Sequence, residues 1–268
     1  MNSKKLQLLR DKYFISPNEQ SATLYLEQVE IALKSVMMHS GDSPMYPTNI
    51  GIPTITDLIK KAQIPKKLST EPKNILKNLH QNIQGIVKAG HPYMVKNIIP
   101  TVSAPGLAAY YATSIYMGNA VTGEDAGQAL FAELACVSAI SKLVGWDETQ
   151  SGGVFTFGGT ATNLYAIKIG LHKVDPEHSK KGITQPVVCV ESAPSHYCHT
   201  TAADWLSIGT DNLIQVNSNP DQTTKLDELE DVCIKAIKAG KKIACINALG
   251  GTTSNMGIDN IKEIYDMR

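Results

Sequence analysis

The sequence has little arginine: only Arg10 and Arg268 among 268 residues. Few arginine side chains are therefore present that could bind a ligand carboxylate in a bidentate manner. The 25 basic residues are matched by 25 acidic ones, so the formal net charge is zero. Without a basic surplus, we expect neither nucleic acid nor an anionic membrane as a partner. No run approaches the roughly 18 apolar residues of a membrane-spanning helix.

Cysteine is also sparse and arranged without a metal-binding or disulfide pattern. The five cysteines are odd in number and include no CxxC pair. We therefore expect no disulfide framework, no zinc site and no other metal. The first eleven residues are polar and rich in lysine, so they do not resemble a secretory signal. A reducing cytoplasm is the expected location.

Residues 1–90 are expected to form a helical N-terminal segment. Apolar residues recur near helical spacing in 21–38 and again in 74–89. Nothing in this segment carries obvious chemistry. A second region, 91–268, begins where prolines at 92 and 100 interrupt the helical pattern. An amphipathic helix is expected over 127–144; its Glu133 either lies on the solvated face or points into a site.

After this helix, short apolar runs alternate with helical stretches. Strands are expected at 154–157, 187–190, 213–216 and 243–248, and helices at 162–173, 202–207, 226–239 and 259–267. Thr224 and Asp227 have the spacing of a capping box at the start of 226–239. Strands separated by helices predict βαβ units and a mainly parallel sheet that is covered on both faces. Ligands of such sheets bind at the carboxyl ends of the strands.

Three candidate groups follow expected strands. Gly158 and Gly159 form a turn before a helix, and Thr160 can cap that helix and donate its hydroxyl, which is typical of a phosphate site. A tight turn without a ligand is an equal alternative. His196 can stack on a flat ring or relay a proton, although His199 is a rival and a plain loop histidine is the commoner case.

The third group is the turn 250–253, with hydroxyls at Thr252 and Thr253; its alternative is ordinary turn chemistry. A flat, phosphorylated cofactor would use all three groups, and pyridoxal phosphate is such a molecule. No GxGxxG or GxxxxGK[ST] pattern is present, so nicotinamide and P-loop sites gain no support.

Several segments, in order and at suitable separations, resemble the group II pyridoxal-phosphate decarboxylases, the family of glutamate and aromatic amino-acid decarboxylases. These segments are His-Pro-Tyr at 91–93 with Pro-Thr at 100–101, Glu133 with Gly-Trp at 145–146, the glycine turn within 152–165, Ser-His-Tyr-Cys at 195–198, and Gly-Thr-Thr within 248–259. The resemblance covers roughly residues 90–268. It implies a type I, aspartate-aminotransferase-like α/β fold with a mainly parallel sheet after the helical segment.

The resemblance also implies residue roles. Gly159 and Thr160 would hold the phosphate of pyridoxal 5'-phosphate. His196 would stack on its ring and deliver a proton, which makes it the expected catalytic residue. Thr253 would lie near the ring, and Thr101 would face the carboxylate of an amino-acid substrate. The family implies a homodimer. Cys198 departs from the serine that is common in the family.

The family's ring-nitrogen aspartate and its cofactor-binding lysine have no counterpart up to Arg268. We therefore expect the chain to be a fragment or a truncated product, inactive as given, of a protein that decarboxylates an amino acid to the amine. Two alternatives stay open. One is a pyridoxal-phosphate-dependent carbon–carbon lyase of the same fold. The other is an inactive chain that binds a partner or nothing.

Overall fold

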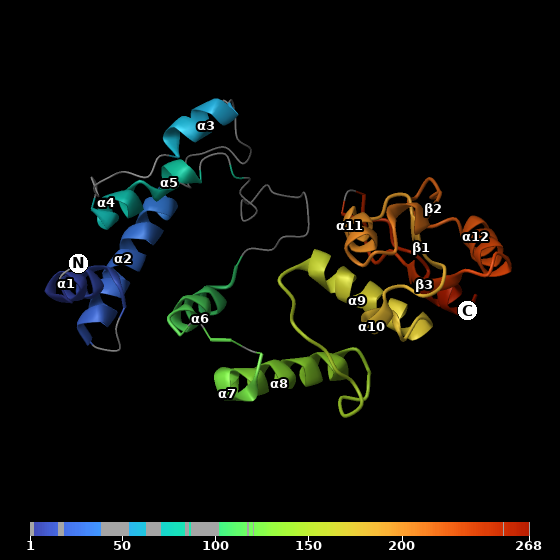
Figure 1. Ribbon diagram of the computed structural model, residues 1–268, viewed down its shortest axis with the longest axis horizontal. Helices are drawn as coiled ribbons and strands as arrows, with labels where there is room; N and C mark the ends of the chain where they lie inside the picture. The colour runs from blue at the N-terminus through green and yellow to red at the C-terminus, as the bar shows by residue number, and fades with distance from the viewer. Residues whose placement is uncertain are drawn as a thin grey trace. The chain divides into compact units, whose positions relative to one another are not determined.

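The computed structural model describes residues 3–15, 19–38, 54–62, 71–83, 86, 102–116, 118–119, 121–253 and 255–267. The chain forms two compact units (Figure 1). The first comprises residues 1–95 and 99–118, and the second comprises 96–98 and 119–268. The predicted division at residue 90 falls outside the described residues and stays a prediction. Within those ranges, no helix has the length and apolar character needed to cross a bilayer.

The first unit is helical where it is described. Its helices are α1 (Ser3–Tyr13), α2 (Glu19–Met38), α3 (Ile55–Lys61), α4 (Pro72–Lys77), α5 (Leu79–Asn82) and α6 (Ala104–Ser114). The helix expected at 21–38 is confirmed as α2. The helix expected at 74–89 is interrupted at Asn78, which ends α4 and precedes α5. Both short helices pack on α2, where the Ser35 hydroxyl donates to the Lys77 carbonyl over 2.7 Å.

The second unit contains the sheet. Its elements are α7 (Gly123–Ala126), α8 (Gln128–Leu143), α9 (Gly159–Val174), α10 (His178–Lys181), β1 (Val187–Ser192), α11 (Cys198–Trp205), the 3₁₀ turn Thr210–Asn212, β2 (Leu213–Val216), α12 (Leu226–Lys238), β3 (Lys242–Asn247) and α13 (Ile261–Asp266). Three of the four expected strands are thus confirmed, as are the expected helices within a few residues.

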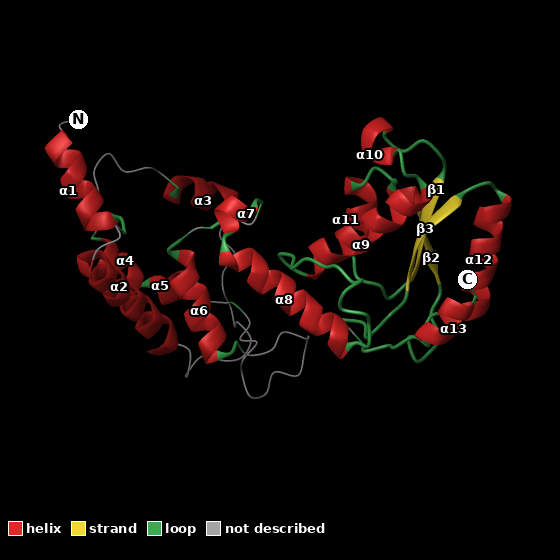
Figure 2. Ribbon diagram, turned by 90° about the horizontal axis from the view of Figure 1, so that it is seen from below, coloured by secondary structure: helices red, strands yellow, loops and turns green. Residues whose placement is uncertain are grey.

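The described strands form one parallel sheet in the order β2-β1-β3, so the predicted parallel sheet is confirmed. Helices α9 and α11 cover one face, and α12 and α13 cover the other (Figure 2). On the first face, Val187 and Cys189 of β1 pack against Leu171 of α9. On the second face, Val190 packs with Leu229 of α12. The central strand β1 is buried along its whole length, as a continuous apolar run predicts.

Helix α9 approaches the sheet more closely than a side chain would allow. A Cβ atom added at Gly170 would lie 2.0 Å from the carbonyl oxygen of Ala244 in β3. Glycine is unfavourable inside a helix by about 1 kcal/mol relative to alanine. Its presence here is explained by this contact between the backbones of helix and strand.

Two local predictions are wrong. The segment 154–157 is not a strand, because it pairs with no strand among the described residues. Thr224 does not form a capping box with Asp227. The N-cap of α12 is Lys225, and the Thr224 hydroxyl instead donates to the buried carboxylate of Asp259 over 2.8 Å. A tertiary partner has displaced the local one.

Candidate cofactor site

The glycine turn opens the longest helix on the sheet. Helix α9 begins at Gly159, and its N-cap is Gly158, which has φ +135° and no side chain to satisfy the first amides. Thr160 lies inside the first turn, so the prediction that it caps the helix is wrong. The first helical hydrogen bond runs from the Thr162 N–H to the Gly158 carbonyl, 3.1 Å. The N–H groups of residues 159–161 therefore have no partner within the helix.

The space in front of this turn is open. A Cβ atom built on Gly158 or on Gly159 would meet no atom within 4 Å, and Thr160 is exposed. Unpartnered amides at the positive end of a 16-residue helix favour an anion, above all a phosphate. The donor set and the free space both fit the phosphate group of a cofactor.

Glu133 supports the segment that leads into the turn. Its carboxylate accepts a hydrogen bond of 2.8 Å from the Phe155 N–H. This contact replaces the sheet partner that 154–157 was predicted to have. Glu133 is half-buried and makes a structural contact to the backbone, which distinguishes it from a residue on the solvated face.

His196 lies in the loop between β1 and α11. Its Nδ1 accepts a hydrogen bond from the Cys198 N–H over 3.1 Å. The ring of Tyr197 lies over it, with centroids 4.2 Å apart and planes tilted by 31°. The Cys198 thiol in turn accepts from the Asn163 side-chain amide of α9 over 3.1 Å. Because Asn163 lies one turn after Gly159, this contact brings the glycine turn and the His196 segment together.

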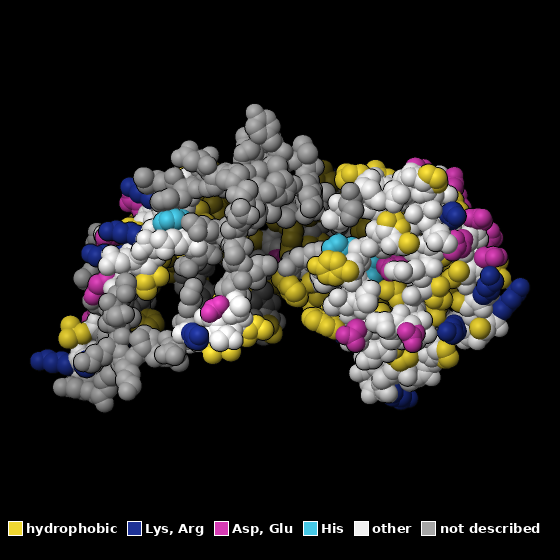
Figure 3. Space-filling model, turned by 90° about the horizontal axis from the view of Figure 1, so that it is seen from above, with side chains coloured by type: hydrophobic (Ala, Val, Ile, Leu, Met, Phe, Trp, Pro, Cys, Tyr) yellow, Lys and Arg dark blue, Asp and Glu magenta, His cyan; other side chains and the backbone are white. Residues whose placement is uncertain are grey.

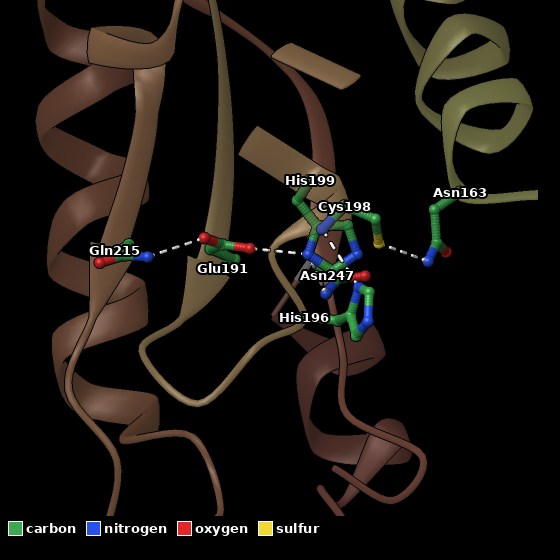
Figure 4. A network of polar contacts seen from close by, with 7 residues as sticks. All are labelled: Asn163, Glu191, His196, Cys198, His199, Gln215 and Asn247. Atoms are coloured by element: carbon green, nitrogen blue, oxygen red, sulfur yellow. Dashed lines mark hydrogen bonds and ion pairs between the residues drawn. The ribbon is translucent and has the colours of Figure 1, made fainter. Parts of the chain in front are cut away.

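A partly buried polar cluster, which the sequence analysis did not identify, lies at the carboxyl end of the sheet (Figure 4). Glu191, Gln215 and Asn247 are register partners on β1, β2 and β3, so they form a row across the sheet. The Gln215 side-chain amide donates to Glu191 Oε1 over 2.9 Å. His199 of α11 lies 2.7 Å from Glu191 Oε2 and 3.2 Å from the Asn247 amide nitrogen, both measured from Nδ1. The side chains of His199 and Glu191 are only 5% and 3% exposed.

Two cysteines precede Glu191 and Asn247 on the same strands, toward the middle of the sheet. Cys189 and Cys245 are register partners on β1 and β3, and both thiols are free. Burial, followed by the neighbouring Cys245 and Glu191, raises the pKa of Cys189 to about 12. Burial and Glu191 also raise the pKa of Cys245. Both thiols therefore stay protonated at neutral pH and act as core residues.

The turn after β3 is anchored by a buried carboxylate. Asp259 accepts from the Thr224 N–H and the Leu249 N–H, each over 2.7 Å. Thr252 is buried, and its hydroxyl accepts from the Gly257 N–H over 3.0 Å. Thr253 is exposed beside it. Among the described residues, no hydrogen bond or ring contact links Thr253 to His196 or to Gly159.

The structure thus joins two of the three predicted groups. Gly159, Thr160 and His196 lie on segments that contact each other through Asn163 and Cys198. Thr253 follows the third strand at the same edge of the sheet but makes no contact with them. Thr101 lies outside the described residues. The polar row carried one detectable signal in the sequence: positions 187, 189 and 191 alternate toward one face, so a carboxylate at 191 must end an otherwise apolar face.

One family model and several solved structures match this chain. The family model for the pyridoxal-dependent decarboxylase conserved domain matches residues 58–268. Among solved structures, the chain is similar to the glutamate decarboxylase domain of diaminobutyrate-pyruvate transaminase and L-2,4-diaminobutyrate decarboxylase from Vibrio parahaemolyticus. The identity is 20% and the TM-score 0.83, covering 98% of this chain and 59% of that one.

Two further structures show the same fold. Mouse CSAD is 23% identical with a TM-score of 0.78, covering 93% of this chain and 52% of that one. Oryza sativa TDC, solved with PLP and tryptamine, is 14% identical with a TM-score of 0.76, covering 95% and 54%. This chain spans between 52% and 59% of the length of these structures. The predicted type I α/β fold is confirmed.

Proposed function

We propose a function from one premise: the chain belongs to the family of pyridoxal-dependent decarboxylases. The cofactor of this family is pyridoxal phosphate, which when bound supplies an electron sink for the charge left on the substrate when carbon dioxide departs. The proposed reaction of the whole protein is decarboxylation of an amino acid to the corresponding amine. The observation that carries this proposal is the open, uncapped start of α9 and its link to the His196 segment.

Gly159 and Thr160 would bind the phosphate. The amides of the first turn of α9 have no partner within the helix, and the exposed hydroxyl of Thr160 would add a donor. The absence of side chains at 158 and 159 lets the anion approach the backbone.

His196 would lie against the cofactor ring and hold the proton that is returned to the product. One face of its imidazole is covered by Tyr197, so the opposite face is left for stacking. Thr253, at the end of β3, would border the ring, and Thr101 would face the substrate carboxylate. These roles stay proposals.

The whole protein would act as a homodimer. Large apolar side chains are exposed on α8 and just before α9, among them Phe131, Leu143 and Phe157 at 61%, 85% and 90%. Figure 3, which views the molecule from the side opposite to Figure 2, shows hydrophobic side chains also on another surface of the unit that holds the sheet. A second copy would cover such a surface.

The test is product analysis. The purified whole protein is incubated with pyridoxal phosphate and a panel of amino acids, and carbon dioxide and amine are measured. We expect both, in equal amounts, for at least one amino acid. We expect Thr160→Ala to weaken binding of pyridoxal phosphate about tenfold, since a hydrogen bond to a charged group contributes about 1.5 kcal/mol.

Other outcomes would overturn the proposal. Cleavage to an aldehyde without carbon dioxide would point to the carbon–carbon lyase. No product with any amino acid, together with no spectral change on adding pyridoxal phosphate, would leave an inactive chain. Thr160→Val, which removes the hydroxyl but keeps the volume, serves as the matched variant in the binding assay.

A further inference from the structure

The polar row at the end of the sheet has an unusual composition for its place. It continues the face on which Val187 and Cys189 pack, yet it buries a carboxylate and an imidazole. A buried ion pair often stabilises no more than apolar residues of similar size, because both groups lose their hydration. Its presence here calls for a contribution other than stability, and fixing one geometry is the best-attested alternative.

The contacts of Glu191 and His199 indicate which of the two side chains holds the shared proton. Glu191 accepts from the Gln215 side-chain amide at Oε1, and its Oε2 lies 2.7 Å from His199 Nδ1. We assign the proton of this contact to His199 Nδ1, because a carboxylate can accept a hydrogen bond there but cannot donate one. The side-chain amide of Asn247 also lies near this Nδ1–H. Exchanging the nitrogen and oxygen of that amide by a 180° rotation places its oxygen there as a second acceptor.

His199 connects this row to His196. Its backbone N–H donates to the His196 carbonyl over 3.3 Å, and the neighbouring Cys198 N–H donates to His196 Nδ1 over 3.1 Å. The first turn of α11 is therefore held on two sides. Asn163 of α9 holds it through Cys198, and the strand ends hold it through His199.

We propose that His199, fixed by Glu191 and Asn247, is a positioning residue for His196. It holds the first turn of α11 so that the Cys198 amide occupies His196 Nδ1, and the neutral His196 ring then carries its proton at Nε2. His196 thus presents Nε2–H as its one free donor. This inference rests on the proposed role of His196 at the cofactor.

The first test reads the histidine rings of the unmodified protein without cofactor. Nitrogen-15 NMR of ring-labelled protein distinguishes a protonated from an unprotonated ring nitrogen, and His196→Gln assigns the signals. We expect Nδ1 of His196 to be unprotonated and Nε2 to be protonated. Protonation of His196 at Nδ1, or an even mixture of the two forms, would overturn the proposal without any variant at His199.

The second test compares variants. His199→Leu removes the contact to Glu191, whereas His199→Asn keeps a donor near the same place. In His199→Leu, we expect His196 to populate both neutral tautomers, with the proton at Nδ1 or at Nε2. We also expect the dissociation constant for pyridoxal phosphate to rise about tenfold. We expect His199→Asn to restore most of the Nε2-protonated form of His196 and most of the affinity for pyridoxal phosphate. Asp175→Asn is the control, since it alters another buried carboxylate, at the C-cap of α9.

The outcomes separate the possibilities. Unchanged His196 signals in a folded His199→Leu protein would refute the positioning role. Equal changes in His199→Leu and Asp175→Asn would also refute it, because general loosening would explain both. If pyridoxal phosphate fails to bind even the unmodified protein, the proposed function fails, while the ring signals still decide the role of His199.

Discussion

The substitution Gly170→Ala brings helix propensity and packing into opposition, and the sign of the change in unfolding free energy shows which of the two is larger. Gly170 lies inside α9, where alanine is favoured over glycine by about 1 kcal/mol on helix propensity alone. Packing predicts the opposite, because a Cβ atom at this position would lie 2.0 Å from the backbone oxygen of Ala244. Contacts of a real Cβ atom under 3.0 Å essentially never occur. Helix α9 would have to move away from β3 by about that difference.

Neither partner can relax by changing a rotamer, because one atom is a Cβ and the other belongs to the backbone of a strand. The cost therefore lies near the upper end of the 1–3 kcal/mol that is typical of overpacking. After subtracting about 1 kcal/mol of helix propensity, we expect a net destabilisation of about 2 kcal/mol. The shift also moves the start of α9, so binding of pyridoxal phosphate at Gly159 should weaken.

The measurement is urea unfolding followed by circular dichroism, for the variant and the parent protein. Ala166→Gly is the matched control, since Ala166 is exposed on the same helix and reports propensity without the contact. It should cost about 1 kcal/mol. A Gly170→Ala protein as stable as the parent, or more stable, would refute the close approach of α9 to β3.

Three further predictions follow from single contacts. Glu133→Ala should lower the unfolding free energy by about 1 kcal/mol through loss of the Phe155 hydrogen bond, and Glu133→Gln should retain most of it in the same urea titration. The amide and hydroxyl of Thr184 lower the pKa of Asp175. The contribution of Asp175 to stability is therefore complete above its unfolded pKa near 4 and is lost as the pH falls through the folded pKa. Asp175→Asn should reduce the dependence of the melting temperature on acidic pH, and an unchanged dependence would contradict this prediction. In native protein at pH 8, iodoacetamide should modify the exposed Cys136 first and Cys189 last, because the pKa of Cys189 is about 12; mass spectrometry that finds Cys189 modified early would show that β1 is not buried.

Alternation of short apolar runs with amphipathic helices was enough to predict the parallel sheet. The runs at 187–190 and 213–216 became β1 and β2. The signal was clearest at β1, because a strand that is buried on both faces leaves a continuous apolar run. The glycine turn and His196 were identifiable because small residues and a histidine follow expected strands. Their joining through Asn163 and Cys198 was not, since that contact links residues 35 positions apart.

The errors have a common physical cause. At 154–157 the composition favours a strand, but pairing is a tertiary event, and Glu133 supplies the partner instead. At Thr224 the local capping spacing is correct, yet Asp259 offers a better buried acceptor. Apart from the alternation that places Glu191 on the face of Val187 and Cys189, the row of Glu191, Gln215 and Asn247 has no local signature, because it exists only when the three strands are in register.

That dependence on register has a kinetic consequence. Glu191 meets Gln215 across 24 residues, and His199 meets Asn247 across 48. Closing such loops is slow compared with forming a helix, and parallel pairing cannot start from a hairpin. The cluster therefore closes only after all three strands have docked. During refolding, the ring signal of His199 should be among the last to reach its native value, so it reports when the sheet has become complete.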